Sequence, residues 1–80
     1  MSRWTPCRRR EFIRQLRQLG FDGPFSGTWH QFMLYEARRL AIPSNAEYSV
    51  PQLRVMIREV EEILGREITL VESVMKHSRA

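Results

Sequence analysis

Apolar residues recur every three or four positions near the start of the chain, as they do along the buried side of a helix. These positions are Phe12, Ile13, Leu16 and Leu19. Thr5 and Pro6 suit the cap and the first residue of a helix, because the N–H that proline lacks has no helical partner there. Gly20 suits a left-handed helix end. The pattern therefore predicts a helix from Pro6 to Leu19.

A second helical pattern occupies the second half of the chain. Its apolar positions are Leu53, Met56, Ile57, Val60, Ile63 and Leu64. Ser49 and Gln52 have the spacing of a capping box, in which each residue's side chain bonds to the other's backbone N–H. Gly65 suits the helix end. These residues predict a helix that follows Ser49 and ends near Leu64.

The segment between the two helices carries turn residues and β-forming residues in place of a helical period. Asp22-Gly23-Pro24 and Gly27-Thr28 predict two turns on either side of a short extended piece. Residues 29–35 alternate in a way that predicts a strand. Glu36-Ala37 is a tight connection to a further strand over residues 38–42, which Pro43 ends.

The alternation assigns the side chains of these two strands to faces. Phe32 and Leu34 share one side of the first strand, and Leu40 and Ile42 share one side of the second. We expect an antiparallel hairpin in which these four apolar residues lie together against the core. His30 has the same parity as Phe32, but it lies at the open end of the strand, where burial should be incomplete.

The order of elements predicts an α+β fold in a single domain over residues 1–80, with its core at about 5–65. The architecture is a three-stranded antiparallel sheet with two helices on one face. This α-β-β-β-α order is the one found in double-stranded-RNA-binding domains. A capping box at Thr69 and Glu72 predicts an additional short C-terminal helix over about residues 70–76.

Positive charge is concentrated in the first half of the chain. Residues 1–40 contain eight arginines and three acidic residues, a net charge of +5, whereas residues 41–80 contain five basic and six acidic residues, a net charge of −1. Arginine binds phosphate through a planar fork, so this half suits a polyphosphate partner. Arg10, Arg14 and Arg17 fall together on the polar side of the first helix, either as a solvated face or as an RNA-binding patch.

The remaining composition excludes several classes of protein. A single cysteine, Cys7, rules out an internal disulfide and a thiolate metal cluster, so we expect it to be a structural residue. No apolar run approaches the ~18 residues of a membrane span. The first residues lack the apolar region of a signal peptide. We therefore expect a cytoplasmic protein without a membrane contact.

Short sequences at matching places in this element order resemble one family of small ribonucleases. They are Leu19-Gly20-Phe21, Gly27-Thr28-Trp29-His30-Gln31-Phe32, Ile42-Pro43 and Leu53-Arg54-Val55-Met56-Ile57. Across residues 6 to about 64 the chain resembles the HicA toxins, the mRNA interferases of HicA–HicB toxin–antitoxin systems. The family's most specific short signature is a Gly-Ser/Thr-x-His step at the start of a strand, which here comprises Gly27, Thr28 and His30.

The resemblance implies that His30 is the catalytic histidine of a metal-independent endoribonuclease that cleaves mRNA and needs no cofactor. It also implies a HicB-type antitoxin as the protein partner, which covers the active site. The chain departs from many HicA proteins at two positions. Trp29 and Asn45 stand where those proteins have histidines, so this sequence does not supply a second imidazole as general acid.

Elementary chemistry assigns roles to the residues around His30. RNA carries its own nucleophile, the ribose 2′-OH, and an imidazole can take up its proton near neutral pH. Arg38 and Arg39, or the arginines of the first helix, are candidates to stabilise the charge of the phosphate. Trp29 or Tyr35 could stack on an unpaired base. Water or Tyr35 would then have to serve as the proton donor.

Two other functions remain open from the sequence. The chain could be an RNA-binding module that keeps the fold and the basic surface but does not cleave. It could also be a degenerate toxin that only binds its antitoxin. In both cases His30 would be a structural or vestigial residue.

Overall fold

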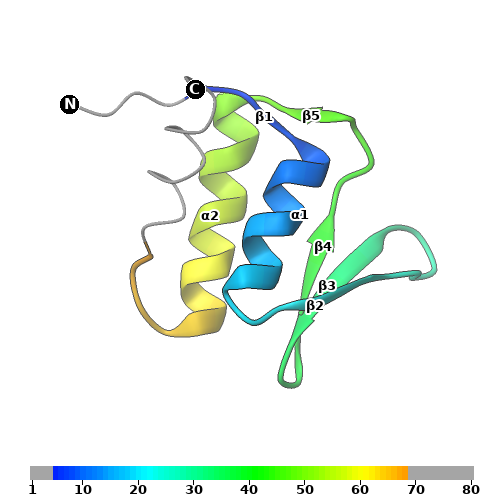
Figure 1. Ribbon diagram of the computed structural model, residues 1–80, viewed down its shortest axis with the longest axis vertical. Helices are drawn as coiled ribbons and strands as arrows, with labels where there is room; N and C mark the ends of the chain where they lie inside the picture. Colours follow the sequence, from blue (N-terminus) through cyan, green and yellow to red (C-terminus); the bar gives the residue numbers. More distant parts are fainter. Residues whose placement is uncertain (1–4, 69–80) are drawn as a thin grey trace.

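The computed structural model describes residues 5–68, which form two helices and five strands. The elements are β1 (Cys7–Arg8), α1 (Arg9–Gln18), β2 (Asp22–Phe25), β3 (Gln31–Tyr35), β4 (Arg38–Ile42), β5 (Glu47–Tyr48) and α2 (Val50–Leu64). Strands β2, β3 and β4 make an antiparallel sheet in chain order, with both helices on one side of it (Figure 1). The predicted α+β architecture is confirmed. The predicted helix over 70–76 lies outside the described residues.

Helix α1 begins three residues later than the sequence predicted. Cys7 and Arg8 are extended and pair with Tyr48 and Glu47 of β5, so the cap predicted at Thr5 is wrong. The N–H of Arg9 then donates to the carbonyl oxygen of Ala46, the residue before β5. Pairing with β5 satisfies backbone groups that a helix start would leave open, and it buries the Cys7 side chain. This two-stranded sheet was not predicted.

Helix α2 begins and ends as its sequence predicts. The Ser49 hydroxyl oxygen accepts a hydrogen bond of 3.3 Å from the N–H of Gln52, and Gly65 ends the helix in the left-handed conformation with φ 75°. The Gln52 side chain does not complete the capping box. It exchanges hydrogen bonds of 3.2 and 3.4 Å with the Asn45 side chain, which ties the loop before β5 to the start of α2.

One hydrophobic core joins the helices to the inner face of the sheet. Its buried side chains are Cys7, Phe12, Ile13, Leu16, Phe21, Met33, Leu40, Ile42, Tyr48, Leu53, Met56, Ile57 and Val60. Leu19, Ile63 and Leu64 pack against it and are partly buried. The apolar positions that defined both helices in the sequence are therefore the ones that the helices turn inward.

The buried side of β3 is the opposite of the one predicted. Met33 is completely buried and lies across from Leu40, whereas Phe32 and Leu34 are half-buried on the other face. Leu40 and Ile42 are buried as expected. The hairpin is thus confirmed, but the predicted pairing of its apolar faces is wrong.

The length of the connection explains this error. Only Glu36 and Ala37 separate the strands, so Tyr35 pairs with Arg38, and every odd-numbered residue of β3 faces an even-numbered residue of β4. Residues directly opposite each other project to the same face of a sheet. Because β4 buries its even-numbered residues, β3 must bury its odd-numbered ones.

Two further boundaries differ from the prediction. Asp22-Gly23-Pro24, expected as a turn, belongs to strand β2, with a cis peptide bond before Pro24 and an irregular register against β3. Strand β3 starts at Gln31, so Trp29 and His30 lie in the bend that precedes it.

Two alanine variants test the register of the hairpin. Leu40→Ala should lower the free energy of unfolding by about 2–5 kcal/mol, because it opens a cavity in the core. Leu34→Ala, the same chemical change on the outer face, should cost no more than about half as much, because water already reaches that side chain. Urea denaturation of both variants measures the difference. Equal losses would contradict the register.

Burial at the contact between β1 and β5 raises the pKa of two ionisable side chains. The Tyr48 hydroxyl donates a hydrogen bond of 2.7 Å to the Pro43 carbonyl oxygen, and burial raises the pKa of Tyr48 to about 12. Burial is also the main cause that raises the pKa of Cys7 to about 11, and the nearby carboxylates of Glu11 and Glu47 add to it.

These shifts predict a loss of stability at alkaline pH. The ordinary pKa values are 9.0 for Cys7 and 10.0 for Tyr48, so the unfolded chain releases both protons before the folded one does. The contribution is complete below about pH 9 and is lost as the pH rises to about 12, by about 1–3 kcal/mol in total. Urea denaturation at several pH values measures it. Tyr48→Phe should flatten the decline above pH 10, and an unchanged slope would contradict the assignment.

Candidate functional site

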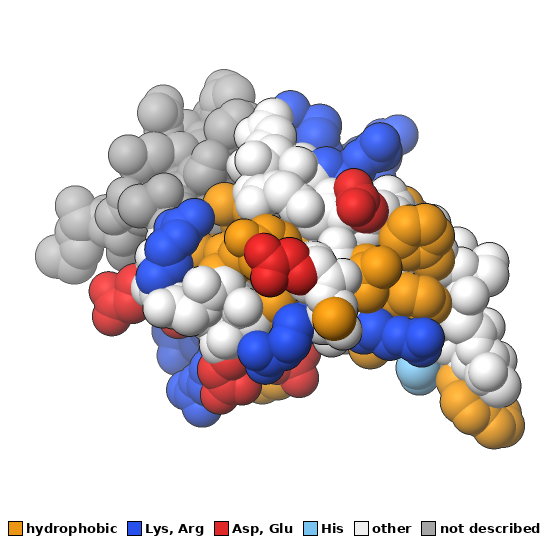
Figure 2. All heavy atoms as spheres, turned by 90° about the horizontal axis from the view of Figure 1, so that it is seen from below, with side chains coloured by type: hydrophobic (Ala, Val, Ile, Leu, Met, Phe, Trp, Pro, Cys, Tyr) orange, Lys and Arg blue, Asp and Glu red, His pale blue; other side chains and the backbone are white. Residues whose placement is uncertain are grey.

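The histidine singled out by the sequence lies on the exposed connection between β2 and β3. We call residues 26–30 the His30 loop; all five are exposed, and Trp29 is 87% exposed. Figure 2 shows the histidine in pale blue at the surface. Among residues 5–68, no hydrogen bond or ion pair engages the imidazole. The expected incomplete burial of His30 is confirmed, and its ring nitrogens are open to a ligand.

Gly27 determines the path of the His30 loop. A Cβ atom at this position would collide with the carbonyl oxygen of His30 and lie 3.3 Å from the ring of Phe32. The requirement for glycine is therefore one of space, because the backbone of residue 27 passes directly over that of residue 30. Gly27 and Thr28 were predicted as the turn before the histidine, and this contact gives Gly27 a physical reason for that place.

Arg9 connects the start of β3 to the first turn of α1. Its Nη2 donates to Oε1 of Gln31, the residue that follows His30, and its Nε donates to the Pro43 carbonyl oxygen at 3.0 Å. One guanidinium group thus holds the beginning of β3 and the end of β4 against the helix. Its plane is fixed by two hydrogen bonds in different directions.

Sequence reasoning missed Arg9, although the sequence contains a sign of its position. Arg9 precedes Phe12 and Ile13 by three and four residues, so it lies on the side of α1 that faces the core. A charged residue at the end of a buried stripe needs partners. Their identity, Gln31 and Pro43, depends on the tertiary structure.

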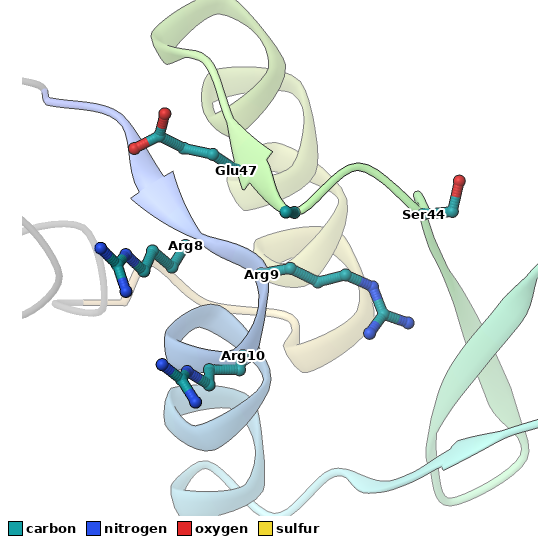
Figure 3. A pocket seen from close by; sticks show the side chains of 6 residues that line it. Arg8, Arg9, Arg10, Ser44 and Glu47 are labelled. Carbon is teal, nitrogen blue, oxygen red and sulfur yellow. The ribbon is translucent and has the colours of Figure 1, made fainter.

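Three consecutive arginines line a hollow of about 590 Å³ at the junction of β1 and α1. The lining residues are Arg8, Arg9, Arg10, Ser44, Ala46 and Glu47. Arg8 and Arg10 point to one side of the junction, whereas Arg9 points the other way, toward Ser44 (Figure 3). Three guanidinium groups against the one carboxylate of Glu47 give the hollow a positive charge, which suits an anion such as phosphate.

The structure separates the two arginines of β4. Arg38 pairs with Tyr35 beside the turn, at the end of the hairpin away from His30. The guanidinium carbon of Arg39 lies 4.5 Å from the centre of the Phe32 ring, two residues along the chain from His30. Of the two predicted phosphate ligands, only Arg39 therefore lies toward the His30 loop.

The two residues predicted to stack on a base, Trp29 and Tyr35, also differ in their distance along the chain from His30 and in their exposure. Trp29 is next to His30 and almost fully exposed. Tyr35 is half-buried, and its ring packs on Phe21 at 5.2 Å between centres, at the turn end of β3. Of the two, only Trp29 therefore lies beside the histidine with its ring accessible.

The three arginines predicted on α1 do lie together on one side of that helix. Arg10, Arg14 and Arg17 are exposed and line a common groove, and Arg14 forms an ion pair of 2.6 Å with Glu11. This groove is lined by residues of α1 and not by the His30 loop. The three arginines form a second basic area, which Arg10 joins to the hollow at the junction of β1 and α1.

Among residues 5–68, no group of three or more His, Cys, Asp or Glu side chains could hold a metal ion. No helix in this range is long and apolar enough to cross a membrane. Comparison with known protein families, with curated proteins and with solved structures gives no match to this chain.

Replacing Gly27 tests how the His30 loop is held. Gly27→Ala should displace the backbone of residues 27–30, because the added methyl group cannot fit against the His30 carbonyl oxygen, and should lower the free energy of unfolding by about 1–3 kcal/mol. Thr28→Ala, in the same exposed loop, is the control. Amide chemical shifts of residues 26–32 measure the displacement. Unchanged shifts in Gly27→Ala would contradict the close approach.

Proposed function

We propose that this protein is a metal-independent endoribonuclease of the HicA type, the toxin of a toxin–antitoxin system. The observation that carries the proposal is the exposed, unpartnered imidazole of His30, on a loop whose path Gly27 restricts. Arg9 bonds to the next residue, Gln31, and Arg39 lies over the ring of Phe32, two residues along the chain from His30. His30 is the residue that the resemblance to HicA toxins selects as catalytic. The basic charge of the first half of the chain supports an RNA substrate.

In the proposed reaction His30 acts as general base. Its imidazole takes the proton of a ribose 2′-OH, and the 2′-oxygen attacks the adjacent phosphorus. The bond from phosphorus to the 5′-oxygen breaks, which leaves a 2′,3′-cyclic phosphate on one fragment and a 5′-hydroxyl on the other. The nucleophile is already beside the phosphate in RNA, so the protein needs to supply only proton transfer and charge stabilisation.

Arginine side chains stabilise the negative charge that develops on the phosphate. The guanidinium of Arg9 is held by Pro43 and by Gln31, the residue that follows His30 in the chain, and a cation that is already fixed in place costs little reorganisation during the reaction. Arg39 supplies a second positive charge on the other face of β3. Arg8 and Arg10 point to the other side of the junction between β1 and α1, where they add to the overall positive charge that attracts RNA.

The protonation of the departing 5′-oxygen falls to water. Trp29 and Asn45 occupy the places of two histidines of many HicA proteins, and Tyr35 is turned toward Phe21. Without a positioned acid the enzyme would be slow, since general acid catalysis contributes about 10²–10⁴-fold. A slow enzyme that tolerates many sequences suits a toxin acting on cytoplasmic mRNA.

The expected protein partner is a HicB-type antitoxin that covers His30. The exposed loop with Trp29 and the arginine hollow offer an apolar contact and a positive surface to such a partner. The missing second imidazole also favours a rival function, in which the chain keeps its RNA or antitoxin binding but has lost cleavage.

Replacing His30 tests the proposed activity. The purified protein should cleave unstructured RNA in the presence of EDTA and leave 2′,3′-cyclic phosphate ends. His30→Ala should reduce the rate by about 10²–10⁴-fold without changing the unfolding temperature. RNA with 2′-O-methyl groups should resist cleavage, because its nucleophile is blocked. Gel analysis of end-labelled fragments measures the cleavage by the wild type, the rate of His30→Ala and the resistance of the methylated RNA. Thermal unfolding verifies that His30→Ala is folded.

A second variant serves as the control for surface changes. Arg58→Gln removes a charge from the exposed side of α2 and should leave the rate unchanged. Cleavage that persists in His30→Ala would exclude the histidine as base. RNA binding without cleavage by the wild type would favour the RNA-binding module, and binding only to an antitoxin would favour the degenerate toxin.

A further inference from the structure

The outer face of the sheet, turned away from the helices, carries an aromatic pair capped by an arginine. Phe25 of β2 and Phe32 of β3 are directly opposite each other, with ring centres 5.6 Å apart and a tilt of 39°. The guanidinium carbon of Arg39 lies 4.5 Å from the centre of the Phe32 ring. We call Phe25, Phe32 and Arg39 the outer platform.

The outer platform is accessible. Phe25 is 42% exposed, and among residues 5–68 only Trp29 and Val55 are other large apolar side chains with comparable exposure. Figure 2 shows hydrophobic surface bordered by basic side chains on the side of the molecule that carries the histidine. Phe25 is exposed and Phe32 half-buried, so the pair presents aromatic surface to water beside a cation, as ligand-binding patches do.

The direction of Arg39 points to the kind of ligand. Arg39 and Asp22 both lie opposite Leu34, in one row across the sheet. The guanidinium is nevertheless found over Phe32, one row closer to the His30 loop. Among residues 5–68, Arg39 forms no ion pair, so its charge is available on the ring surface.

Aromatic rings and a guanidinium group together match a nucleotide. The flat face of an unpaired base stacks on the rings, and the guanidinium meets its phosphate or stacks on the base. A protein partner of the antitoxin kind would instead be expected to bring a carboxylate to Arg39. In duplex RNA the faces of the bases are already stacked on each other, so the platform would reach only single strands.

We propose that the outer platform binds an unpaired base of the RNA and that the substrate is therefore single-stranded RNA, led along the sheet toward His30. This inference rests on the proposed ribonuclease function and adds its substrate class. The loop from Phe25 to His30 is short, and Gly27 packs against both the His30 backbone and the Phe32 ring. The backbone of residue 27 therefore connects the platform to the loop that carries the imidazole.

Binding of a non-cleavable RNA tests the platform. A fluorescent single-stranded 2′-O-methyl RNA of mixed sequence is titrated with the full-length protein, and a duplex of the same sequence is titrated in parallel. Phe25→Leu, which removes the ring and keeps an apolar side chain, should weaken single-strand binding by roughly 5- to 150-fold. Phe25→Tyr should bind as the wild type does. The duplex should bind weakly to all of them.

Two further variants test whether the effect is specific to the platform. Val55→Ala changes an even more exposed apolar residue, on α2, and should leave binding unchanged. Arg39→Gln should weaken binding and lower the slope of log Kd against log salt by about 0.7, the contribution of one phosphate contact to a single strand. Thermal unfolding of each variant verifies that it is folded.

The outcomes separate this inference from the ribonuclease proposal. If Phe25→Leu binds the single strand as tightly as the wild type, or if the duplex binds equally well, the platform is overturned even where His30-dependent cleavage persists. If the wild type cleaves no RNA but its single-strand binding depends on Phe25, the platform is supported and the nuclease proposal fails. If Phe25→Leu loses binding to a protein antitoxin but keeps its binding to single-stranded RNA, the platform is a protein interface and the inference is overturned.

Discussion

The register of the β3–β4 hairpin is the constraint on which the rest of the structure depends. A connection of two residues pairs Tyr35 with Arg38, and this pairing determines the face of every side chain in both strands. Met33 and Leu40 then meet the helices, where they complete the core. Phe32 is left on the outer face, together with Arg39. A shift by one residue would exchange the two faces, burying the cation and exposing the core.

A single guanidinium joins this hairpin to the helical layer at the position where chemistry is expected. Arg9 lies at the end of the apolar side of α1 and donates to Gln31 and to the Pro43 carbonyl oxygen. Its hydrogen bonds hold together the first residue of β3 and the residue after β4. The His30 loop ends directly before Gln31, one of the two partners of Arg9. The same interaction thus contributes to stability and to the placement of the exposed imidazole.

The two faces of the sheet have different roles in the proposed enzyme: one packs in the core, and the other faces the substrate. The inner face, with Met33, packs on the helices and keeps the hairpin rigid. The outer face, with Phe25 and Arg39, stays in contact with water and is the surface proposed to hold a nucleotide. At the end of the sheet, His30 and Trp29 are carried by a loop whose path Gly27 restricts. A rigid scaffold that presents its polar and aromatic groups on one exposed side is typical of a binding site on a small domain.

The sequence by itself determined the features that depend on neighbouring residues: the stripe and end of α1, the cap and end of α2, the existence of the hairpin and the exposure of His30. Helical periodicity and capping act within a few residues, so they can be read locally. Only the tertiary structure decided the pairing of Cys7 with Tyr48, the bridge from Arg9 to Gln31 and the burial of Tyr35 on Phe21. The partners in these contacts are 14 or more positions apart, and folding brings them together through the shared core, which no local pattern specifies.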